Sequence, residues 1–344
     1  MSAVATTSTS DRAVAGAQRL AGLAERGLRA AARPLARTGF PWRAPTVPRG
    51  VSVPAVEPEL GADYDTEWAR EPLPTVVRSV IAAGPMRLMT RLLARTEVHG
   101  LDRLADLGRM EDPPSLIFAP NHHSHLDTAV MVRAIPAVWR RDLVVAAAAD
   151  YFFDRRWKAA VSALALNAIP IDREGTGRRS ADLIRSLMEQ GSSLLIYPEG
   201  GRSPDGWGQE FKGGAAYLAS RTGAEVVPVY IDGTGRIFGK GMRRPRRGRA
   251  RVVFGAPLRP EEGESTRRFN QRISAAVERL ADESMSDFWT AARRSAAGTT
   301  PPLTGPRAIG WRRAWQLTEF RRAGIAGRSE RSARRWPDLG ARLR

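Results

Sequence analysis

Residues 115–127 read Ser-Leu-Ile-Phe-Ala-Pro-Asn-His-His-Ser-His-Leu-Asp. The first five residues form a short, mostly apolar run, which predicts a buried strand that ends at Pro120. A polar run follows at once, and a helical pattern then extends from Thr128 to Trp139. This order is typical of an α/β unit, in which functional side chains lie beyond the carboxyl ends of the strands.

The same alternation continues along the chain. Apolar runs predict strands at 143–149, 168–172, 193–197, 226–232 and 251–254, and helical periodicity predicts helices at 181–190, 211–221 and 266–294. Helices that alternate with buried strands predict an α/β fold with a mostly parallel or mixed central sheet flanked by helices.

Basic amphipathic extensions are expected at both ends of this fold. Residues 1–75 combine a helical pattern at 11–38, with Arg every seven residues, and a Pro-rich linker at 39–75. Residues 76–290 hold the α/β domain, and residues 291–344 form a tail rich in Arg and Trp.

His122 and Asp127 are five positions apart in the polar run. On one ideal helix they would point about 140° apart, so they meet only if His122 lies in the turn before the helix. Pro120 and Asn121 supply a strand end and a capping residue for that turn. An imidazole beside a carboxylate is a general base, since the carboxylate fixes the ring tautomer and stabilises the imidazolium. Taken alone, the pair also fits polar surface residues at the start of a helix.

A second motif, Tyr-Pro-Glu-Gly-Gly-Arg-Ser, occupies residues 197–203 and directly follows a predicted strand. The two motifs, in this order and spacing, resemble those of the glycerolipid acyltransferase family over about residues 95–260. The resemblance implies that His122 deprotonates an acceptor hydroxyl, which attacks an acyl thioester directly, and that Asp127 orients the imidazole.

The resemblance also implies roles for residues around the two motifs. Acceptor binding is assigned to Arg173, Glu199, Gly200 and Arg202, with supporting positions at Asn121, Ser124, Lys212 and Pro228. An Arg offers two parallel hydrogen bonds to phosphate oxygens, and a Gly permits close backbone approach. The family usually has Thr where Gly201 stands, which leaves acceptor choice and loop shape open. Pro228, inside a predicted strand, indicates an edge strand or a bulge.

A different reading of the first motif is a zinc hydrolase. His123, His125 and Asp127 spell His-x-His-x-Asp, but the next residue is Thr128, and the chain has only four His. A zinc site of this type needs further ligands from distant loops. We therefore expect His123 and His125 to be wall or surface residues, and no metal at the site.

The composition points to an anionic partner. The formal net charge is +18, with 54 basic and 36 acidic residues, and several Arg cluster between Arg236 and Arg251. The expected partners are anionic membrane lipids and acyl-CoA or acyl-carrier protein as the donor substrate, with no other cofactor. Nucleic acid is disfavoured because no zinc-finger, RNP or helix-turn-helix pattern accompanies the charge.

The chain has no Cys, which excludes disulfides and a Cys nucleophile. The oligomeric state stays open.

Membrane contact is expected without a spanning helix. The most apolar helical stretch, 73–94, contains three Arg and a Gly-Pro pair that would kink it, which favours a helix lying in the interface. The first residues lack the charge and apolar pattern of a signal peptide. We expect a peripheral protein at the cytoplasmic face of the membrane.

The function expected from the sequence is transfer of a fatty acyl group to a glycerolipid hydroxyl, in particular the sn-2 hydroxyl of 1-acyl-glycerol-3-phosphate. Two alternatives stay open beside the zinc hydrolase. One is the same chemistry on glycerol-3-phosphate, another lysophospholipid or a glycolipid. The other is a non-catalytic relative that binds membrane or nucleic acid through its basic extensions.

Overall fold

The computed structural model describes residues 60–172 and 178–305. The predicted N-terminal helix at 11–38, Arg173, and the tail from residue 306 lie outside these residues.

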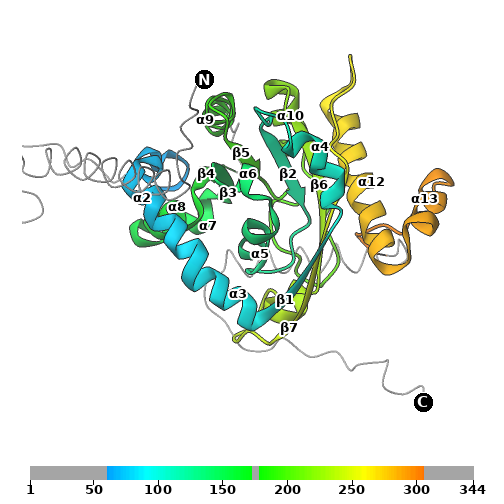
Figure 1. Cartoon of the computed structure of the whole chain (residues 1–344), viewed down its shortest axis with the longest axis horizontal. Helices are drawn as coiled ribbons and strands as arrows, with labels where there is room; N and C mark the ends of the chain where they lie inside the picture. The colour runs from blue at the N-terminus through cyan, green and yellow to red at the C-terminus, as the bar shows by residue number, and fades with distance from the viewer. Residues whose placement is uncertain (1–59, 173–177, 306–344) are drawn as a thin grey trace, which may run out of the picture. The chain divides into compact units, whose positions relative to one another are not determined.

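Within the described residues, seven strands form one sheet in the order β1-β7-β6-β2-β5-β3-β4 (Figure 1). The strands are β1 (Ala94–His99), β2 (Leu116–Pro120), β3 (Leu143–Ala148), β4 (Ala168–Ile171), β5 (Ser193–Leu195), β6 (Glu225–Asp232) and β7 (Gly248–Phe254). β1 runs parallel to β7, and β3 runs parallel to both β4 and β5, whereas β6 and β7 are antiparallel. The predicted α/β fold with a mixed sheet is confirmed. β2 carries the run 116–120 and is buried along its whole length.

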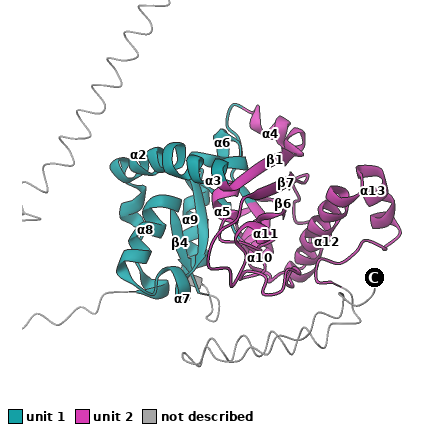
Figure 2. Cartoon of the chain, turned by 90° about the horizontal axis from the view of Figure 1, so that it is seen from below, with its two compact units in different colours: residues 1–92, 111–117, 132–196 teal, residues 93–110, 118–131, 197–344 magenta. Residues whose placement is uncertain are grey.

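The chain divides into two compact units, shown in different colours in Figure 2. The described part of the first unit comprises residues 60–92, 111–117, 132–172 and 178–196. Its helical segments are η1 (Gly61–Asp63), η2 (Glu67–Arg70), α2 (Pro72–Ile81), η3 (Ala82–Met86), most of α3 (Arg87–Leu93), α6 (Ala137–Arg140), α7 (Ala149–Phe152), α8 (Arg156–Leu166) and α9 (Arg178–Glu189). Phe153 lies in a buried cluster with Ala159 and Ala168, and the Arg78 guanidinium bonds α2 to the Leu164 carbonyl in α8 at 3.0 Å.

Two proline positions explain how the helices of this unit begin and end. α2 and α3 are joined by the π-helical segment η3, which contains Pro85, so the regular α-helical hydrogen bonding is interrupted at the residues where a kink is predicted. The single helix predicted from Thr128 to Trp139 is wrong. The chain forms α5 (Asp127–Ala134) and then α6, because Pro136 has no N–H with which to continue the first helix.

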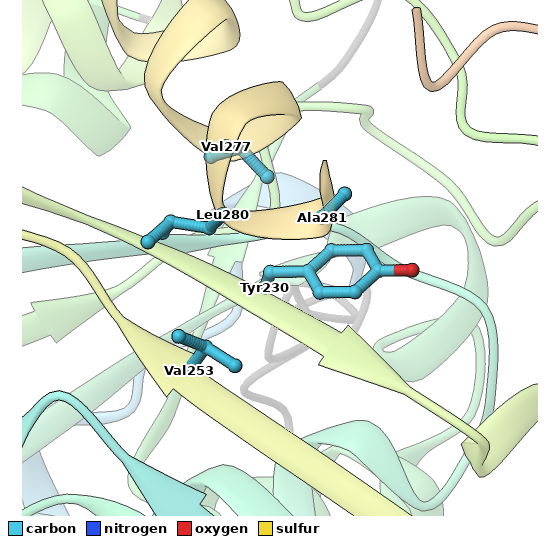
Figure 3. Close-up of a cluster of buried hydrophobic side chains, with 5 residues drawn as sticks. All are labelled: Tyr230, Val253, Val277, Leu280 and Ala281. Atoms are coloured by element: carbon cyan, nitrogen blue, oxygen red, sulfur yellow. The ribbon is translucent and has the colours of Figure 1, made fainter. Parts of the chain in front are cut away.

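The described part of the second unit comprises residues 93–110, 118–131 and 197–305. Its helical segments are η4 (Leu101–Leu104), α4 (Ala105–Gly108), the start of α5, α10 (Gly214–Thr222), α11 (Thr234–Phe238), α12 (Thr266–Met285) and α13 (Phe288–Ala296). The apolar face of α12 lies against β6 and β7, where Val277, Leu280 and Ala281 pack with Tyr230 and Val253 (Figure 3). Burial of this kind supplies most of the stability of an amphipathic helix. α13 crosses the predicted domain boundary at residue 290.

Candidate active site

Both sequence motifs lie in the second unit, and the first follows the carboxyl end of β2. Asn121, the residue after β2, is fully buried and bonds to the backbone of Ile231 in β6. Its amide N–H donates to the Ile231 carbonyl at 2.9 Å, and its amide oxygen accepts the Ile231 N–H at 2.7 Å. The side chain therefore continues the ladder of the sheet, and it places the start of the loop that carries His122.

The predicted pairing of His122 with Asp127 is present in the structure. His122 Nδ1 lies 2.9 Å from Asp127 Oδ2, with His122 in the loop and Asp127 at the first residue of α5. The same oxygen accepts the backbone N–H groups of His123 and Ser124 at 2.7 and 2.8 Å. One carboxylate oxygen thus accepts two backbone N–H groups of the loop and also contacts the imidazole.

The surroundings of this pair leave one ring nitrogen for chemistry. The Asp127 side chain is fully buried, and the His122 side chain is 17% exposed. A carboxylate at Nδ1 favours the tautomer with its proton on that nitrogen, so Nε2 keeps its lone pair. Within the described residues, no protein group is bonded to Nε2. The arrangement can therefore accept a proton from a bound hydroxyl.

Tyr197 packs against the imidazole, a role that the sequence did not predict. Its ring stacks on His122 with centroids 4.0 Å apart and planes inclined by 26°. The hydroxyl lies 3.1 Å from Thr128 Oγ1 in α5. Burial, followed by the nearby charge of Asp127, raises the pKa of Tyr197 well above its usual range, so the phenol stays neutral. Tyr197 therefore restricts the tilt of the imidazole without adding charge beside it.

Glu199 and Ser203 hold the backbone of His122 on its two sides. Glu199 Oε1 accepts the His122 N–H at 2.8 Å, and the Ser203 N–H donates to the His122 carbonyl at 2.8 Å. The other oxygen of Glu199, Oε2, accepts the Gln209 N–H at 2.8 Å, and the residue is only 3% exposed. The second motif therefore supports the loop that carries His122. Acceptor contact by Glu199 stays a prediction.

Gly200 has a left-handed backbone conformation and lies close to the Lys212 side chain. Its φ is +67°, and a Cβ at this position would come within 3.0 Å of the Lys212 side chain. Lys212 is held by its backbone N–H, which donates to the Pro198 carbonyl at 2.8 Å. Lys212 therefore crosses the turn of the second motif. The carbonyl of Gly201, the position where the family usually has Thr, accepts from Gln209 Nε2 at 2.8 Å.

Ser124 joins the loop that carries His122 to the end of α11. Its hydroxyl donates to the Phe238 carbonyl at 2.8 Å and accepts the Leu126 N–H at 3.0 Å. The backbone of Ser124 also forms an isolated antiparallel bridge with Gly239. Both Asn121 and Ser124 therefore bond the loop to the backbone of other segments.

The remaining two histidines of the motif have different surroundings. His123 packs its Cβ toward Gly235, and burial lowers its pKa below the ordinary value. His125 Nε2 lies 2.5 Å from Arg202 Nη1, and its ring lies 5.2 Å from that of Phe238. Burial, and then the charge of Arg202, lowers the pKa of His125 to about 4. Among the described residues, no cluster of three metal-ligating side chains is placed to hold a metal ion.

Pro228 lies inside β6 and is buried. An edge position is wrong, because β6 lies between β7 and β2. A bulge is present beside Pro228, but its extra residue lies on the facing segment, residues 254–258. Val229 pairs with Phe254 and Val226 bridges to Leu258, so three steps along β6 face four steps on the other segment. Pro228 lies opposite the extra residue, and its carbonyl accepts the Gly255 N–H at 2.8 Å.

Comparison with known proteins gives a consistent result. Residues 95–232 match the family model described as Acyltransferase. The 1-acyl-sn-glycerol-3-phosphate acyltransferase alpha of Ovis aries is 30% identical over 187 residues, which are 52% of this chain and 60% of that protein. The chloroplastic 1-acyl-sn-glycerol-3-phosphate acyltransferase BAT2 of Brassica napus is 28% identical over 48% of this chain and 45% of its own length. The chain thus spans about half the length of these two curated relatives.

A solved structure is also similar to this chain. The crystal structure of the 1-acyl-sn-glycerophosphate acyltransferase PlsC from Thermotoga maritima aligns with a TM-score of 0.48 and 22% identity. The alignment covers 62% of this chain and 82% of that one. The family match includes His122, Asp127, Glu199 and Arg202, the residues on which the predicted resemblance depends.

Proposed function

Since residues 95–232 of this chain match the acyltransferase family model, we propose that the protein transfers a fatty acyl group from a thioester to a hydroxyl of a glycerolipid. The acceptor is 1-acyl-glycerol-3-phosphate, and the donor is acyl-CoA or acyl-carrier protein. The names of the curated relatives support this acceptor, because both are 1-acyl-sn-glycerol-3-phosphate acyltransferases. The positive charge of the chain suits either donor, since both are anionic.

In the proposed reaction, Nε2 of His122 takes the proton of the acceptor hydroxyl as its oxygen attacks the thioester carbonyl. The tetrahedral intermediate collapses with cleavage of the C–S bond, and the departing sulfur receives the proton from Nε2. Asp127 stabilises the imidazolium that exists between the two proton transfers. The reaction proposed here requires the two side chains alone, with no further cofactor.

The observation that carries the proposal is the way His122 is held. Its ring nitrogen Nδ1 is bonded to Asp127, its face is covered by Tyr197, and its backbone is bonded on both sides by Glu199 and Ser203. General bases act efficiently when they are fixed within hydrogen-bond reach of the proton that they remove. A surface histidine at a helix start needs none of these supports.

Cationic side chains of the second motif suit the phosphate of the acceptor. Arg202 contacts the loop that carries His122 through His125, and the Lys212 side chain lies against Gly200 of the second motif. An Arg guanidinium recognises phosphate through paired hydrogen bonds, and a Lys ammonium acts as a point charge. We assign acceptor binding to these two residues and, from the family resemblance, to Arg173.

The first unit has an apolar surface that suits a lipid interface. On α2 and α3, side chains at helical spacing point outward, with Val76 60% and Val80 64% exposed. The exposed apolar residues of these helices and of α8 are Leu73, Val76, Val77, Val80, Leu88, Met89, Leu92, Trp157 and Val161. No helix of the described chain has the length and apolarity to cross a bilayer. We propose that this face binds the membrane peripherally, on its cytoplasmic side.

The experiment that tests the proposed activity is acyl transfer from a labelled long-chain acyl-CoA, and separately from acyl-carrier protein. The acceptors are 1-acyl-glycerol-3-phosphate, glycerol-3-phosphate, other lysophospholipids and a glycolipid. Loss of the general base in His122→Ala should lower the rate by about 10²–10⁴-fold. Transfer to a different acceptor would replace the substrate in the proposal. The absence of transfer to every acceptor from both donors would refute the activity and favour a binding protein.

A further inference from the structure

His125 lies between an aromatic ring and the guanidinium of the second motif. Its ring contacts Phe238 at a centroid distance of 5.2 Å and an interplanar angle of 38°. Its Nε2 atom lies 2.5 Å from Nη1 of Arg202, a residue 77 positions later in the chain. The reaction described above does not use this imidazole.

The contact requires a neutral imidazole. Every guanidinium nitrogen is a donor, so His125 Nε2 must accept the hydrogen bond, and the ring proton must be on Nδ1. Partial burial, the charge of Arg202 and a smaller contribution from His122 disfavour the imidazolium; they outweigh the opposing effect of Asp127 and lower the pKa of His125 to about 4. At neutral pH the ring is therefore an acceptor for Arg202.

The position of this acceptor is itself determined by the fold. His125 belongs to the loop that Asp127 and Asn121 hold in place, and Phe238 belongs to a segment bonded to that loop. The link is Ser124, whose hydroxyl donates to the Phe238 carbonyl at 2.8 Å. Two segments distant in sequence thus place the ring, and the ring gives a long, flexible Arg side chain a defined partner.

We propose that His125 is a positioning residue, which holds the Arg202 guanidinium in the orientation that binds the acceptor phosphate. This inference rests on the proposed function. An Arg side chain loses substantial rotamer freedom when it binds a ligand, so a partner that orders it beforehand strengthens binding. His125 therefore acts on recognition of the phosphorylated acceptor, whereas His122 acts on the chemical step.

The test compares His125→Phe with His125→Gln. Phe keeps a flat ring against Phe238 but cannot accept a hydrogen bond, whereas Gln keeps an acceptor oxygen. We expect His125→Phe to raise the KM for 1-acyl-glycerol-3-phosphate about tenfold, with kcat changed less than about twofold, because a hydrogen bond to a charged group is lost. His125→Gln should recover most of the wild-type KM. His99→Phe, which replaces an exposed histidine of β1, is the matched control and should leave this KM unchanged.

A double-mutant cycle shows whether the effect passes through Arg202. If it does, adding His125→Phe to Arg202→Ala lowers kcat/KM no further, because the partner is already absent. An equal loss of kcat/KM on adding His125→Phe to wild type and to Arg202→Ala would overturn the proposal. An unchanged acceptor KM in His125→Phe, or an effect on kcat alone, would also overturn it. A wild-type protein that transfers no acyl group to any acceptor would instead refute the proposed function. An active wild type with a normal His125→Phe variant would refute this inference alone.

Discussion

Replacing Glu199 with glutamine tests whether this residue supports the loop that carries His122 or binds the acceptor. Family resemblance assigns it to acceptor binding. In the structure, both carboxylate oxygens accept backbone N–H groups, one from His122 and one from Gln209, each at 2.8 Å. A glutamine has one acceptor oxygen and one NH2 group. One of the two backbone donors must therefore face another donor inside a site where Glu199 is only 3% exposed.

The size of the effect follows from these contacts. Two hydrogen bonds to a charged acceptor stabilise the fold by about 1.5–3 kcal/mol each, whereas the single neutral bond that remains contributes about 0.5–1.5 kcal/mol. We therefore expect Glu199→Gln to lower the free energy of unfolding by about 3 kcal/mol. The loop around His122 becomes free to shift, and a displacement of about 1 Å from the reactive geometry costs about 10²-fold in rate.

The assay measures kcat, the acceptor KM and the thermal unfolding midpoint for wild type, Glu199→Gln and Glu210→Gln. Glu210 is an exposed neighbour, so its variant removes the same charge without disturbing the loop. We expect Glu199→Gln to lower kcat and the unfolding midpoint, and Glu210→Gln to lower neither. A tenfold rise in the acceptor KM, with kcat and the unfolding midpoint unchanged, would refute this reasoning and assign Glu199 to the acceptor.

Three further predictions concern other parts of the molecule. Tyr197→Phe keeps the ring on His122 and should retain kcat within about threefold, whereas Tyr197→Ala should lose at least about tenfold, measured by steady-state kinetics. The pKa of His125 is about 4 in the folded protein and about 6.5 in an unfolded chain, so the native state binds fewer protons between these values. Wild type should therefore lose stability relative to His125→Gln as the pH falls from about 6.5 to 4. The measurement is the urea midpoint of unfolding at each pH, and midpoints that fall equally in both proteins would contradict the prediction. Two carboxylates on the apolar face, in Val76→Asp/Val80→Asp, should reduce sedimentation with anionic vesicles at least about tenfold, whereas two Asp placed at exposed Gln190 and Gln271 should have a smaller effect.

Much of the fold follows from local pattern. The strands predicted at 143–149, 168–172 and 226–232 are present to within one residue at each end, because continuous runs of buried apolar side chains distinguish them. β1 was not predicted. Only Ala94 of this strand is buried, since β1 lies at the edge of the sheet, and its sequence carries no apolar alternation. Its pairing with β7 depends on residues more than 150 positions away.

Local sequence also determined the chemical identity of the site. An imidazole and a carboxylate in a turn between strand and helix predict a base once the second motif at 197–203 accompanies them, because five residues of chain can bring the pair together. The roles of Tyr197, Gln209 and His125 were not predictable, since each depends on where a second segment passes. His125 is exposed, as expected of a wall or surface residue, and its contacts with Arg202 and Phe238 follow only from the tertiary structure.

The sequence by itself thus determined the α/β class, the order of the motifs and the His122–Asp127 pair, all of which depend on short-range periodicity and spacing. Only the tertiary structure decided which groups hold that pair in place. The bond from the His122 N–H to Glu199 spans 77 positions of the chain, and that from Asn121 to Ile231 spans 110. Such contacts form when the sheet brings strand ends together, and a buried polar group must then bond to whichever partner the packing supplies.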